Sequence, residues 1–326
     1  MSTQGVEFVN LNVTVAGNRH LLQDINLRIE PNTTTAFLGR SGSGKTTLLR
    51  TVNALVRPTS GRVLIGDHDV ATIDPIRLRR SIGYVIQDTG LFPRMTIARN
   101  IGMVLELEGR PEPAIRHRAA IMLHHVGLSD DLLHRYPWQL SGGQRQRVGL
   151  ARAIANEPSI LLMDEPFGAL DPLTRSEMQT MLRDLLIKVE GTTIIITHDL
   201  EEALYLADRV IFIDEGRIVA DLPFNEVRTS TNPDVEAYIA ATHRIPVIPL
   251  PLGAAIPTPT HAPSTTPVST IGPDPELPNP DLPDAELPNP QLPDTELPNP
   301  QLPDTELPDP EHPDASGKLK QNWWEI

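Results

Sequence analysis

Residues 39–46 have the sequence Gly39-Arg40-Ser41-Gly42-Ser43-Gly44-Lys45-Thr46, which matches the phosphate-binding pattern G-x-x-x-x-G-K-[ST]. The preceding residues, Thr34–Leu38, are β-branched or apolar and predict a strand, and the following residues, Thr47–Val52, are compatible with a helix. Between a strand and a helix, such a glycine loop directs its backbone N–H groups at phosphate oxygens, next to the helix N-terminus. We therefore predict that the loop from Gly39 to Thr47 binds a nucleotide.

Four polar side chains have chemistry suited to a metal-bound nucleotide. The Lys45 ammonium group would contact the β- and γ-phosphates, and the Thr46 hydroxyl would bind Mg²⁺. Further along the chain, the apolar segment Ser159–Met163 predicts a buried strand that ends in Asp164 and Glu165. Asp164 is placed to hold Mg²⁺ through water, and Glu165 is placed to orient or deprotonate an attacking water. Taken alone, these two carboxylates could also be a solvated strand end.

Four further stretches, two before Asp164 and two after Glu165, complete the pattern. They are Tyr84-Val85-Ile86-Gln87, Leu140-Ser141-Gly142-Gly143-Gln144, Ala169-Leu170-Asp171 and Thr197-His198-Asp199. Together with the glycine loop and the acidic strand end, they resemble the six motifs of ABC (ATP-binding cassette) ATPases, in the same order. The resemblance covers about residues 6–245. A lone histidine is usually structural, so His198 gains its predicted role from this context.

The resemblance implies a role for each stretch. The second glycine turn would close on the γ-phosphate of a nucleotide held by another copy of the chain; it comprises Ser141, Gly142, Gly143 and Gln144. Gln87 would reach Mg²⁺ and the lytic water, His198 would contact the γ-phosphate, and Asp171 would cross the dimer interface. The predicted cofactors are ATP and Mg²⁺. The predicted catalytic residues are Glu165, His198 and Gln87, and the predicted metal ligands are Thr46, Gln87 and Asp164.

The hydrophobic pattern predicts an α/β fold with a mainly parallel sheet at its core. Continuous apolar runs at 159–163 and 192–197, separated by a helix at 172–189, favour parallel strands that are covered on both faces. Alternating segments at 6–9 and 25–29 predict strands, which the resemblance assigns to an antiparallel β subdomain. Helices are predicted at 97–107 and 114–126, inside an inserted helical subdomain of about residues 88–155, and a closing hairpin joins 211–213 to 218–220.

A change in composition divides the chain into an ABC ATPase domain, residues 1–245, and a tail, residues 246–326. Residues 251–326 hold 19 of the 33 prolines and 13 acidic residues against two lysines. Ten-residue repeats rich in proline fill residues 276–315. Because proline fixes φ and removes a hydrogen-bond donor, we expect a disordered, extended spacer. An alternative is that this spacer presents the terminal Trp323-Trp324 pair to a partner.

Two positions depart from the pattern of ABC ATPases. The family usually has an aromatic residue that stacks on adenine, but the corresponding stretch here is Val13-Thr14-Val15-Ala16-Gly17. How this chain would stack adenine is therefore open. The turn before the glycine-loop strand contains Asn32-Thr33 in place of Gly-Glu. Since asparagine tolerates left-handed φ, we expect this turn to form.

Residues 80–93 and 165–172 resemble the ATPase subunits of bacterial type I importers, most of all those for osmoprotectants such as glycine betaine, choline and other quaternary amines. This implies a homodimer or pseudo-dimer of cassettes, permease subunits and, indirectly, a substrate-binding protein. Leu91 and Phe92 would contact a short permease helix, or else fill the core of the helical subdomain. The alternatives are another transporter ATPase, for amino-acid import or for export, and a non-transport ABC ATPase.

Composition excludes several other classes of protein. There is no cysteine, which rules out disulfides and thiolate metal sites. No basic block is interleaved with aromatic residues, so nucleic acid is not an expected partner. No signal peptide or membrane span is visible in the pattern. We therefore expect the chain at the cytoplasmic face of the inner membrane, held there by its permease.

Overall fold

The computed structural model describes residues 4–87, 89–168, 170–189 and 191–242. All of them belong to one compact unit. The predictions for the tail, its repeats and Trp323-Trp324 lie outside the described residues, as does Ala169.

A six-stranded sheet forms the centre of the molecule, in the order β10-β9-β3-β8-β7-β6. Its neighbours are parallel except for β9 and β10, which form the expected antiparallel hairpin. Strands β7 and β8 are buried throughout, in agreement with their continuous apolar sequences. The strands are β3 (Thr34–Leu38), β6 (Ile82–Val85), β7 (Ile160–Asp164), β8 (Thr192–Thr197), β9 (Arg209–Asp214) and β10 (Arg217–Pro223).

A second, antiparallel sheet has the order β2-β1-β4-β5. Buried and exposed side chains alternate along β1, as expected for a sheet with one face on the core. The strands are longer than the segments predicted at 6–9 and 25–29, because β1 continues through register shifts that follow Phe8. The strands are β1 (Val6–Val15), β2 (Arg19–Ile29), β4 (Ser60–Ile65) and β5 (His68–Asp69).

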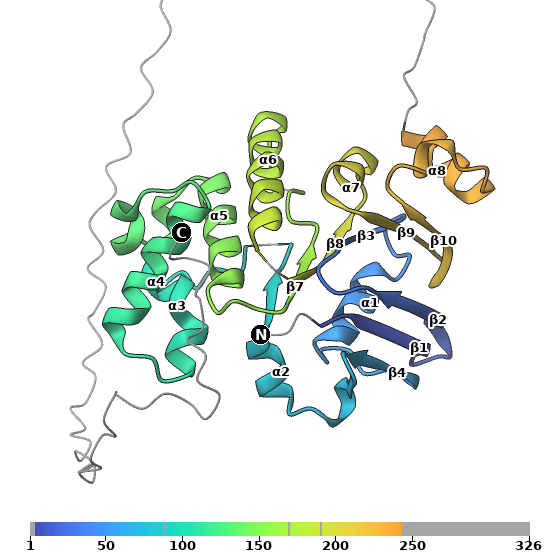
Figure 1. Cartoon of the computed structure of the whole chain (residues 1–326), viewed down its shortest axis with the longest axis horizontal. Coiled ribbons are helices and arrows are strands. Elements are labelled where there is room, and N and C mark those ends of the chain that lie inside the picture. The colour runs from blue at the N-terminus through green and yellow to red at the C-terminus, as the bar shows by residue number, and fades with distance from the viewer. Residues whose placement is uncertain (1–3, 88, 169, 190, 243–326) are drawn as a thin grey trace, which may run out of the picture. The chain divides into compact units, whose positions relative to one another are not determined.

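The two sheets share a hydrophobic core with helix α1 (Lys45–Val52) (Figure 1). Leu48 and Leu49 of this helix are fully buried among side chains from both sheets. The turn before β3 forms as expected, with Asn32 in the left-handed region at a φ of 59°. This packing fixes the start of α1, and with it the glycine loop.

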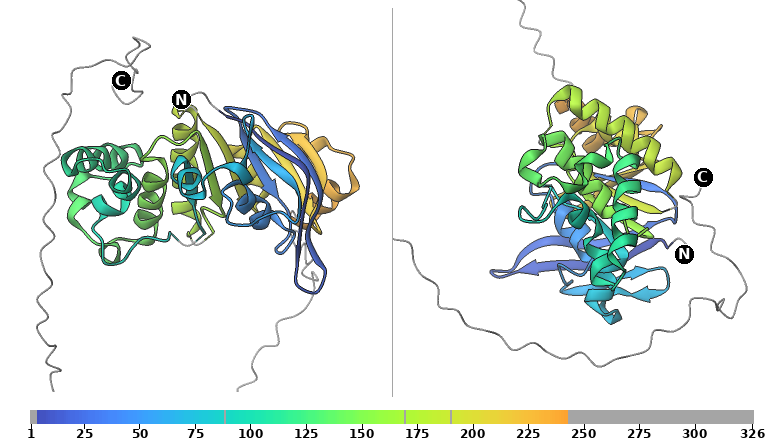
Figure 2. Two further views of the ribbon diagram at one scale, coloured as in Figure 1. Left: turned by 90° about the horizontal axis from the view of Figure 1, so that it is seen from below. Right: turned by 90° about the vertical axis from the view of Figure 1, so that its left-hand side faces the viewer.

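Helices α3, α4 and α5 pack against one another at one end of the described unit, and the antiparallel sheet lies at the other end (Figure 2). The predicted helix at 97–107 has these bounds in the structure. The one predicted at 114–126 begins earlier, at Glu112, because Pro113 fits the first turn, where no N–H is required. The α-helices other than α1 are α2 (Pro75–Ser81), α3 (Ile97–Leu107), α4 (Glu112–His125), α5 (Gly142–Ile154), α6 (Pro172–Lys188), α7 (Leu200–Leu206) and α8 (Pro233–Thr242). The short 3₁₀ turns are Val70–Thr72, Asp130–His134, Pro137–Gln139 and Val227–Thr229.

Candidate functional site

The glycine loop connects β3 to α1 and needs glycine at its last position. Gly44 has a φ of 105°, and a Cβ placed there would lie 2.8 Å from the Leu21 carbonyl oxygen and 2.9 Å from Leu22 Cδ2. Only a residue without a side chain fits this conformation next to β2. The close contact holds the loop against the antiparallel sheet and sets where its N–H groups point.

The turn between β9 and β10 is hydrogen-bonded to the backbone of the glycine loop. The Gly216 N–H donates to the Ser43 carbonyl at 3.0 Å, and the Gly216 carbonyl accepts from the Gln23 N–H at 2.8 Å. A Cβ at Gly216 would lie 2.6 Å from the Leu21 carbonyl oxygen. Gly216 and Gln23, almost 200 positions apart in the sequence, are thus in contact next to the glycine loop.

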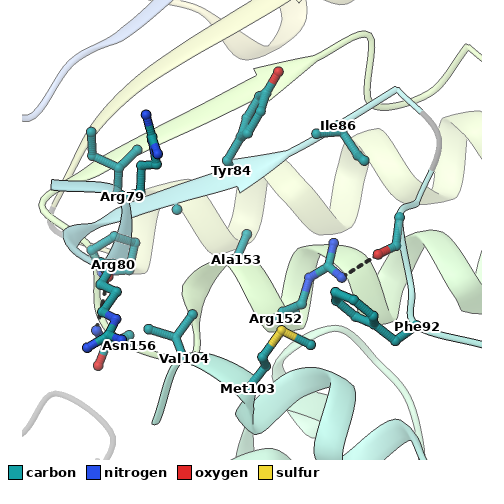
Figure 3. Close-up of a pocket in the computed structure, with 14 residues that line it drawn as sticks. Arg79, Arg80, Tyr84, Ile86, Phe92, Met103, Val104, Arg152, Ala153 and Asn156 are labelled. Carbon is teal, nitrogen blue, oxygen red and sulfur yellow. Dashed lines mark hydrogen bonds between the residues drawn. The ribbon is translucent and has the colours of Figure 1, made fainter. Parts of the chain in front are cut away.

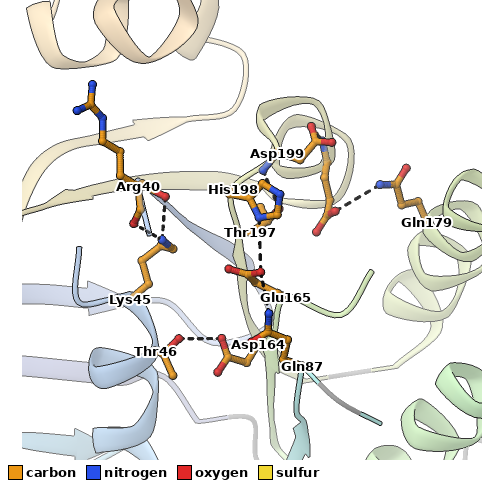
Figure 4. Close-up of polar contacts among 12 residues, drawn as sticks. Arg40, Lys45, Thr46, Gln87, Asp164, Glu165, Gln179, Thr197, His198 and Asp199 are labelled. Atoms are coloured by element: carbon orange, nitrogen blue, oxygen red, sulfur yellow. Dashed lines mark hydrogen bonds and ion pairs between the residues drawn. The ribbon is translucent and has the colours of Figure 1, made fainter. Parts of the chain in front are cut away.

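Lys45 is a buried cation at the first position of α1. Its Nζ donates to the carbonyl oxygens of Gly39 and Arg40, each at 2.8 Å (Figure 4). Burial lowers the pKa of Lys45, while the carboxylates of Glu165 and Asp164 raise it. The two carbonyl groups orient the Lys45 ammonium group but do not neutralise its charge. An anion bound in the glycine loop could therefore pair with this ammonium group.

The loop also fits a phosphate group through its hydroxyls. Ser43 Oγ is buried and has no hydrogen-bond partner among the described residues. The Thr46 hydroxyl donates to Asp164 Oδ1 at 3.0 Å, which joins α1 to the carboxyl end of β7. An unpaired hydroxyl, a buried ammonium group and a helix N-terminus together form a favourable environment for phosphate oxygens.

Asp164 has a second contact that the sequence did not indicate. Arg50 Nη2 lies 3.8 Å from Asp164 Oδ2. Burial raises the pKa of Asp164, and the Thr46 hydroxyl and the Arg50 cation oppose that rise. Arg50 follows Lys45 by five residues, a spacing that carries no motif, so only the fold reveals the pair.

Glu165 is the meeting point of the three predicted catalytic side chains. Gln87 Nε2 donates to Glu165 Oε2 at 3.3 Å, and His198 Nδ1 lies 3.5 Å from the same oxygen (Figure 4). These residues follow β6, β7 and β8, whose carboxyl ends lie at one edge of the parallel sheet. Ligands bind at this edge in open α/β sheets.

The backbone of Glu165 is held in an unusual conformation. Its φ is 47°, in the left-handed region, and its N–H donates to the Ile196 carbonyl at 3.0 Å. A non-glycine residue keeps such a φ only where its surroundings impose it, and such residues concentrate at functional sites. The geometry points the Glu165 carboxylate toward Gln87 and His198.

The described residues fit Mg²⁺ only as part of a complex with nucleotide. Among them, no three His, Cys, Asp or Glu side chains form a metal site on their own. Thr46 and Asp164 are adjacent, and Gln87 is joined to this pair through Glu165. Hydroxyl, carboxylate and amide oxygens suit Mg²⁺, which keeps several waters and takes substrate phosphates as ligands. The roles of these three as metal ligands remain predictions.

The second glycine turn lies at the start of α5. Ser141 Oγ accepts from the Gln144 N–H at 3.2 Å, and Gln144 Oε1 accepts from the Ser141 N–H at 3.0 Å, a capping box. Gly142 and Gly143 form the first turn of the helix. In the described part of the chain, no hydrogen bond or ion pair joins this turn to Lys45 or Glu165, so the fold does not bring the two predicted half-sites together within one copy.

Asp171 lies near this turn, at the start of α6. Its Oδ1 accepts from the Thr174 N–H at 3.1 Å and caps the helix. A Cβ at Gly143 would approach Thr174 Cγ2 to 2.8 Å, so the second glycine turn and the Asp171 segment are neighbours. Gln146 of α5 also donates to the Pro166 carbonyl, one residue after Glu165. This link cannot be predicted from the sequence, because an amide inside a helix carries no motif.

Comparison with known proteins reveals similarity across this region. A family model described as "ABC transporter" matches residues 22–168. The carnitine transport ATP-binding protein OpuCA of Listeria monocytogenes is 42% identical over 245 residues, which are 75% of this chain and 62% of that protein. The sulfate/thiosulfate import ATP-binding protein CysA of Nocardia farcinica is 45% identical over 227 residues, 67% of this chain and 68% of that protein.

A solved structure extends the similarity to the fold. The dimeric structure of an ATP-binding cassette in a post-hydrolysis state, bound to ADP and Pi, has a TM-score of 0.62 and 32% sequence identity. The match covers 67% of this chain and 98% of that one. By contrast, this chain spans less than two thirds of the length of the carnitine transport protein.

Proposed function

This chain belongs to the ABC transporter family, and from that premise we propose that it is the ATP-hydrolysing, energy-coupling subunit of an ABC importer. The observation that carries the proposal is the position of Glu165. Its carboxylate contacts Gln87 and His198, and the preceding residue, Asp164, contacts Thr46 of the glycine loop. A phosphate group in the loop would thus lie beside a base held by two further polar side chains.

The proposed reaction is attack of water on the γ-phosphate of ATP, which breaks the bond to the β-phosphate oxygen and releases ADP and phosphate. Glu165 orients the water and accepts its proton, and Gln87 and His198 hold the carboxylate in place. Lys45 stabilises negative charge on the β- and γ-phosphates. Mg²⁺, held with the help of Thr46, Asp164 and Gln87, would neutralise part of the same charge when bound.

Two copies of the chain form the complete site in this proposal. The Ser141–Gln144 turn presents the N-terminus of α5, which attracts anions, and no hydrogen bond or ion pair among the described residues joins it to the glycine loop of its own copy. It would close on the γ-phosphate held by the partner, with Asp171 at the interface. The similar cassette of known structure is a dimer bound to ADP and Pi, which supports this arrangement.

A groove between β6, α3 and α5 is the proposed docking site for the permease (Figure 3). Its lining includes Tyr84, Phe92, Met103, Val104 and Arg152. Phe92 is 45% exposed, whereas a residue that fills the core would be buried. Arg152 donates to the carbonyls of Thr89 and Gly90 at 2.9 and 2.7 Å, which fixes the loop that follows Gln87. A permease helix bound in this groove would contact the loop that follows Gln87, so its movement could shift Gln87.

We propose an osmoprotectant of the quaternary-amine class, such as glycine betaine or carnitine, as the transported compound. The name of the carnitine transport relative supports this choice, and that of the sulfate/thiosulfate relative provides the competing one. None of the helices described in the structure combines the length and hydrophobicity of a membrane span. The permease would therefore hold the chain at the cytoplasmic face of the membrane, and a substrate-binding protein would deliver the cargo.

The test is transport by a reconstituted complex. The full chain is used as bait to isolate its permease and binding protein from membranes, and the complex is placed in proteoliposomes. ATP-dependent uptake of labelled carnitine or glycine betaine is expected, with little uptake of sulfate; the Glu165→Gln complex serves as the inactive control. Uptake of sulfate alone would overturn the proposed substrate. A chain without turnover in the presence of its permease, and monomeric with ATP, would overturn the proposed function.

A further inference from the structure

Two neighbouring glutamates on α7 have opposite environments. Glu201 is exposed and forms an ion pair with Arg228, whose Nη2 lies 2.6 Å from Glu201 Oε2. Glu202 is only 5% exposed, and its side chain points to α6. Asp199 caps α7 by accepting from the N–H groups of Glu201 and Glu202 at 2.9 and 3.3 Å. The helix start that fixes Glu202 therefore lies directly after His198.

The Glu202 carboxylate is buried with only partial hydrogen bonding. Gln179 Nε2 of α6 donates to Glu202 Oε2 at 3.5 Å (Figure 4). The other oxygen, Oε1, is buried and has no hydrogen-bond partner among the described residues. A buried carboxylate oxygen without a donor costs free energy, so its retention at this position requires an explanation.

Arg175 provides the complementary group across the same groove. The groove between α6 and α7 is lined by Arg175, Gln179, Asp199 and Glu202. Arg175 Nε is buried and, in the described part of the chain, also lacks a hydrogen-bond partner. Its Nη2 donates to the Leu170 carbonyl at 3.1 Å. The groove thus contains an unsatisfied donor from a cation and an unsatisfied acceptor from a carboxylate.

Glu202 and Arg175 each interact with a segment that has a predicted role in hydrolysis. On one side, Thr197 interacts with the Glu202 carboxylate, and its hydroxyl also accepts from the Asp199 N–H at 2.9 Å, so it fixes the backbone before and after His198. On the other side, Arg175 holds the Leu170 carbonyl, next to Asp171. The two side chains that face this groove are thus each tied to one of these segments, Glu202 to the one with His198 and Arg175 to the one with Asp171.

We propose that Glu202 is a positioning residue, which pairs with Arg175 in its ionised form and so holds the His198 segment against the Leu170–Asp171 segment. The proposal rests on the proposed ATPase function and names a control element of that site. Glu202 does not touch the nucleotide in this role. It acts on hydrolysis through the two segments that it joins.

The charge of Glu202 makes this link sensitive to pH. Burial raises the pKa of Glu202 to about 7, with a further rise from Asp199 and opposing effects from Thr197, Gln179 and Arg175. The other titratable groups that line the groove are Glu201 and Tyr205. Glu202 therefore changes charge close to neutral pH, and the pair with Arg175 forms as the pH rises through this range.

The decisive comparison is Glu202→Gln against Glu201→Gln. Glu202→Gln removes the buried charge but keeps the shape of the side chain and an oxygen that can accept from the Gln179 amide. Glu201→Gln changes the adjacent exposed residue. For Glu202→Gln we expect kcat to fall about tenfold at pH 8, with an unchanged KM for ATP and loss of the rise in kcat through about pH 7. Glu201→Gln is expected to keep the wild-type profile. A wild-type kcat and pH profile for Glu202→Gln would overturn the proposal.

Hydrogen exchange provides a readout that does not depend on turnover. At pH 8, Glu202→Gln is expected to exchange amides faster in both segments, 170–176 and 197–203, relative to the rest of the domain, because local opening follows when the link between them is lost. Arg175→Gln, a second variant for the case that the first folds poorly, is expected to have the same effect on both. Faster exchange near residue 202 alone would show a local structural role and would overturn the proposal. A wild-type chain without ATPase activity would contradict the proposed function, while the exchange data would still decide the role of Glu202.

Discussion

His198 Nδ1 lies 3.5 Å from Glu165 Oε2, so an imidazole from the end of β8 reaches the carboxylate that follows β7. The adjacent strand β6 is followed by Gln87, which donates to the same carboxylate oxygen at 3.3 Å. Parallel strands place these three residues at one edge without any local sequence relationship between them. The Glu165 carboxylate therefore has two partners, one from each neighbouring strand end.

Replacing Glu165 with glutamine is expected to lower kcat by about 10²- to 10³-fold, because the amide cannot accept a proton from water. ATP affinity should remain, since Lys45 and the glycine loop are unchanged. The variant should accumulate as an ATP-bound dimer, detectable by light scattering after size-exclusion chromatography. Turnover close to that of the wild type would refute the assignment of Glu165 as base.

Lys45→Ala is expected to weaken ATP binding at least about tenfold, through loss of a charge-assisted contact to phosphate. The substitution also leaves the Gly39 and Arg40 carbonyls without their donor. Titration calorimetry measures the change, with Lys188→Ala, an exposed lysine at the end of α6, as the matched control. Equal dissociation constants for the two variants would contradict the predicted role.

Phe92→Ala is expected to weaken association with the permease by about 2 kcal/mol, the value of one well-buried aromatic contact. Basal ATPase activity should persist, because Asn100 holds the backbone N–H and carbonyl of residue 92 at 2.7 and 3.1 Å regardless of its side chain. Co-purification and ATPase assays test both parts. Ile187→Ala, which removes an exposed side chain on α6, serves as the control. An intact complex with Phe92→Ala would argue against this groove as the docking site.

Gly44→Ala is expected to lower the melting temperature by about 5 °C or more, since the new methyl group would meet the Leu21 carbonyl and the backbone has a left-handed φ. Gly42→Ala is the comparison. Its φ is 81°, but a Cβ there would meet no atom within 4 Å. Differential scanning calorimetry separates the cost of the contact from the cost of the φ angle. An equal loss for both variants would show that the φ angle dominates.

Glu202 should also affect the pH dependence of stability. Because its folded-state pKa is raised from 4.5 to about 7, the protonated form is favoured in the folded chain. Its contribution to stability is fully present below about pH 4.5 and is lost as the pH rises through about 7. The free energy of unfolding of Glu202→Gln, relative to the wild type, should therefore increase by up to about 3 kcal/mol between pH 4 and pH 8. Urea unfolding at several pH values measures it; a constant difference would contradict the raised pKa.

Much of the fold could be predicted from local sequence. The apolar runs of β7 and β8, the glycine loop and the 97–107 helix each have a pattern that their own residues determine. The candidate site residues came from motifs and, for Gln87, His198 and Asp171, from the resemblance to ABC ATPases; their roles remain predictions. Arg50, Arg175 and Gln179 could not be found, because their partners are distant in sequence and their own positions within helices carry no motif. The burial of Glu202 depends on α6, which begins 30 residues earlier.

The contact between Gly216 and Ser43 has a consequence for biosynthesis. The glycine loop is made early on the ribosome, yet its backbone support comes from a turn that emerges more than 170 residues later. Strand β3 likewise cannot pair until its two neighbours, β8 and β9, have been synthesised. Such distant pairing slows folding and leaves the early segments exposed in the meantime. A nascent chain therefore completes the backbone support of its glycine loop only after translation has passed the β9–β10 turn.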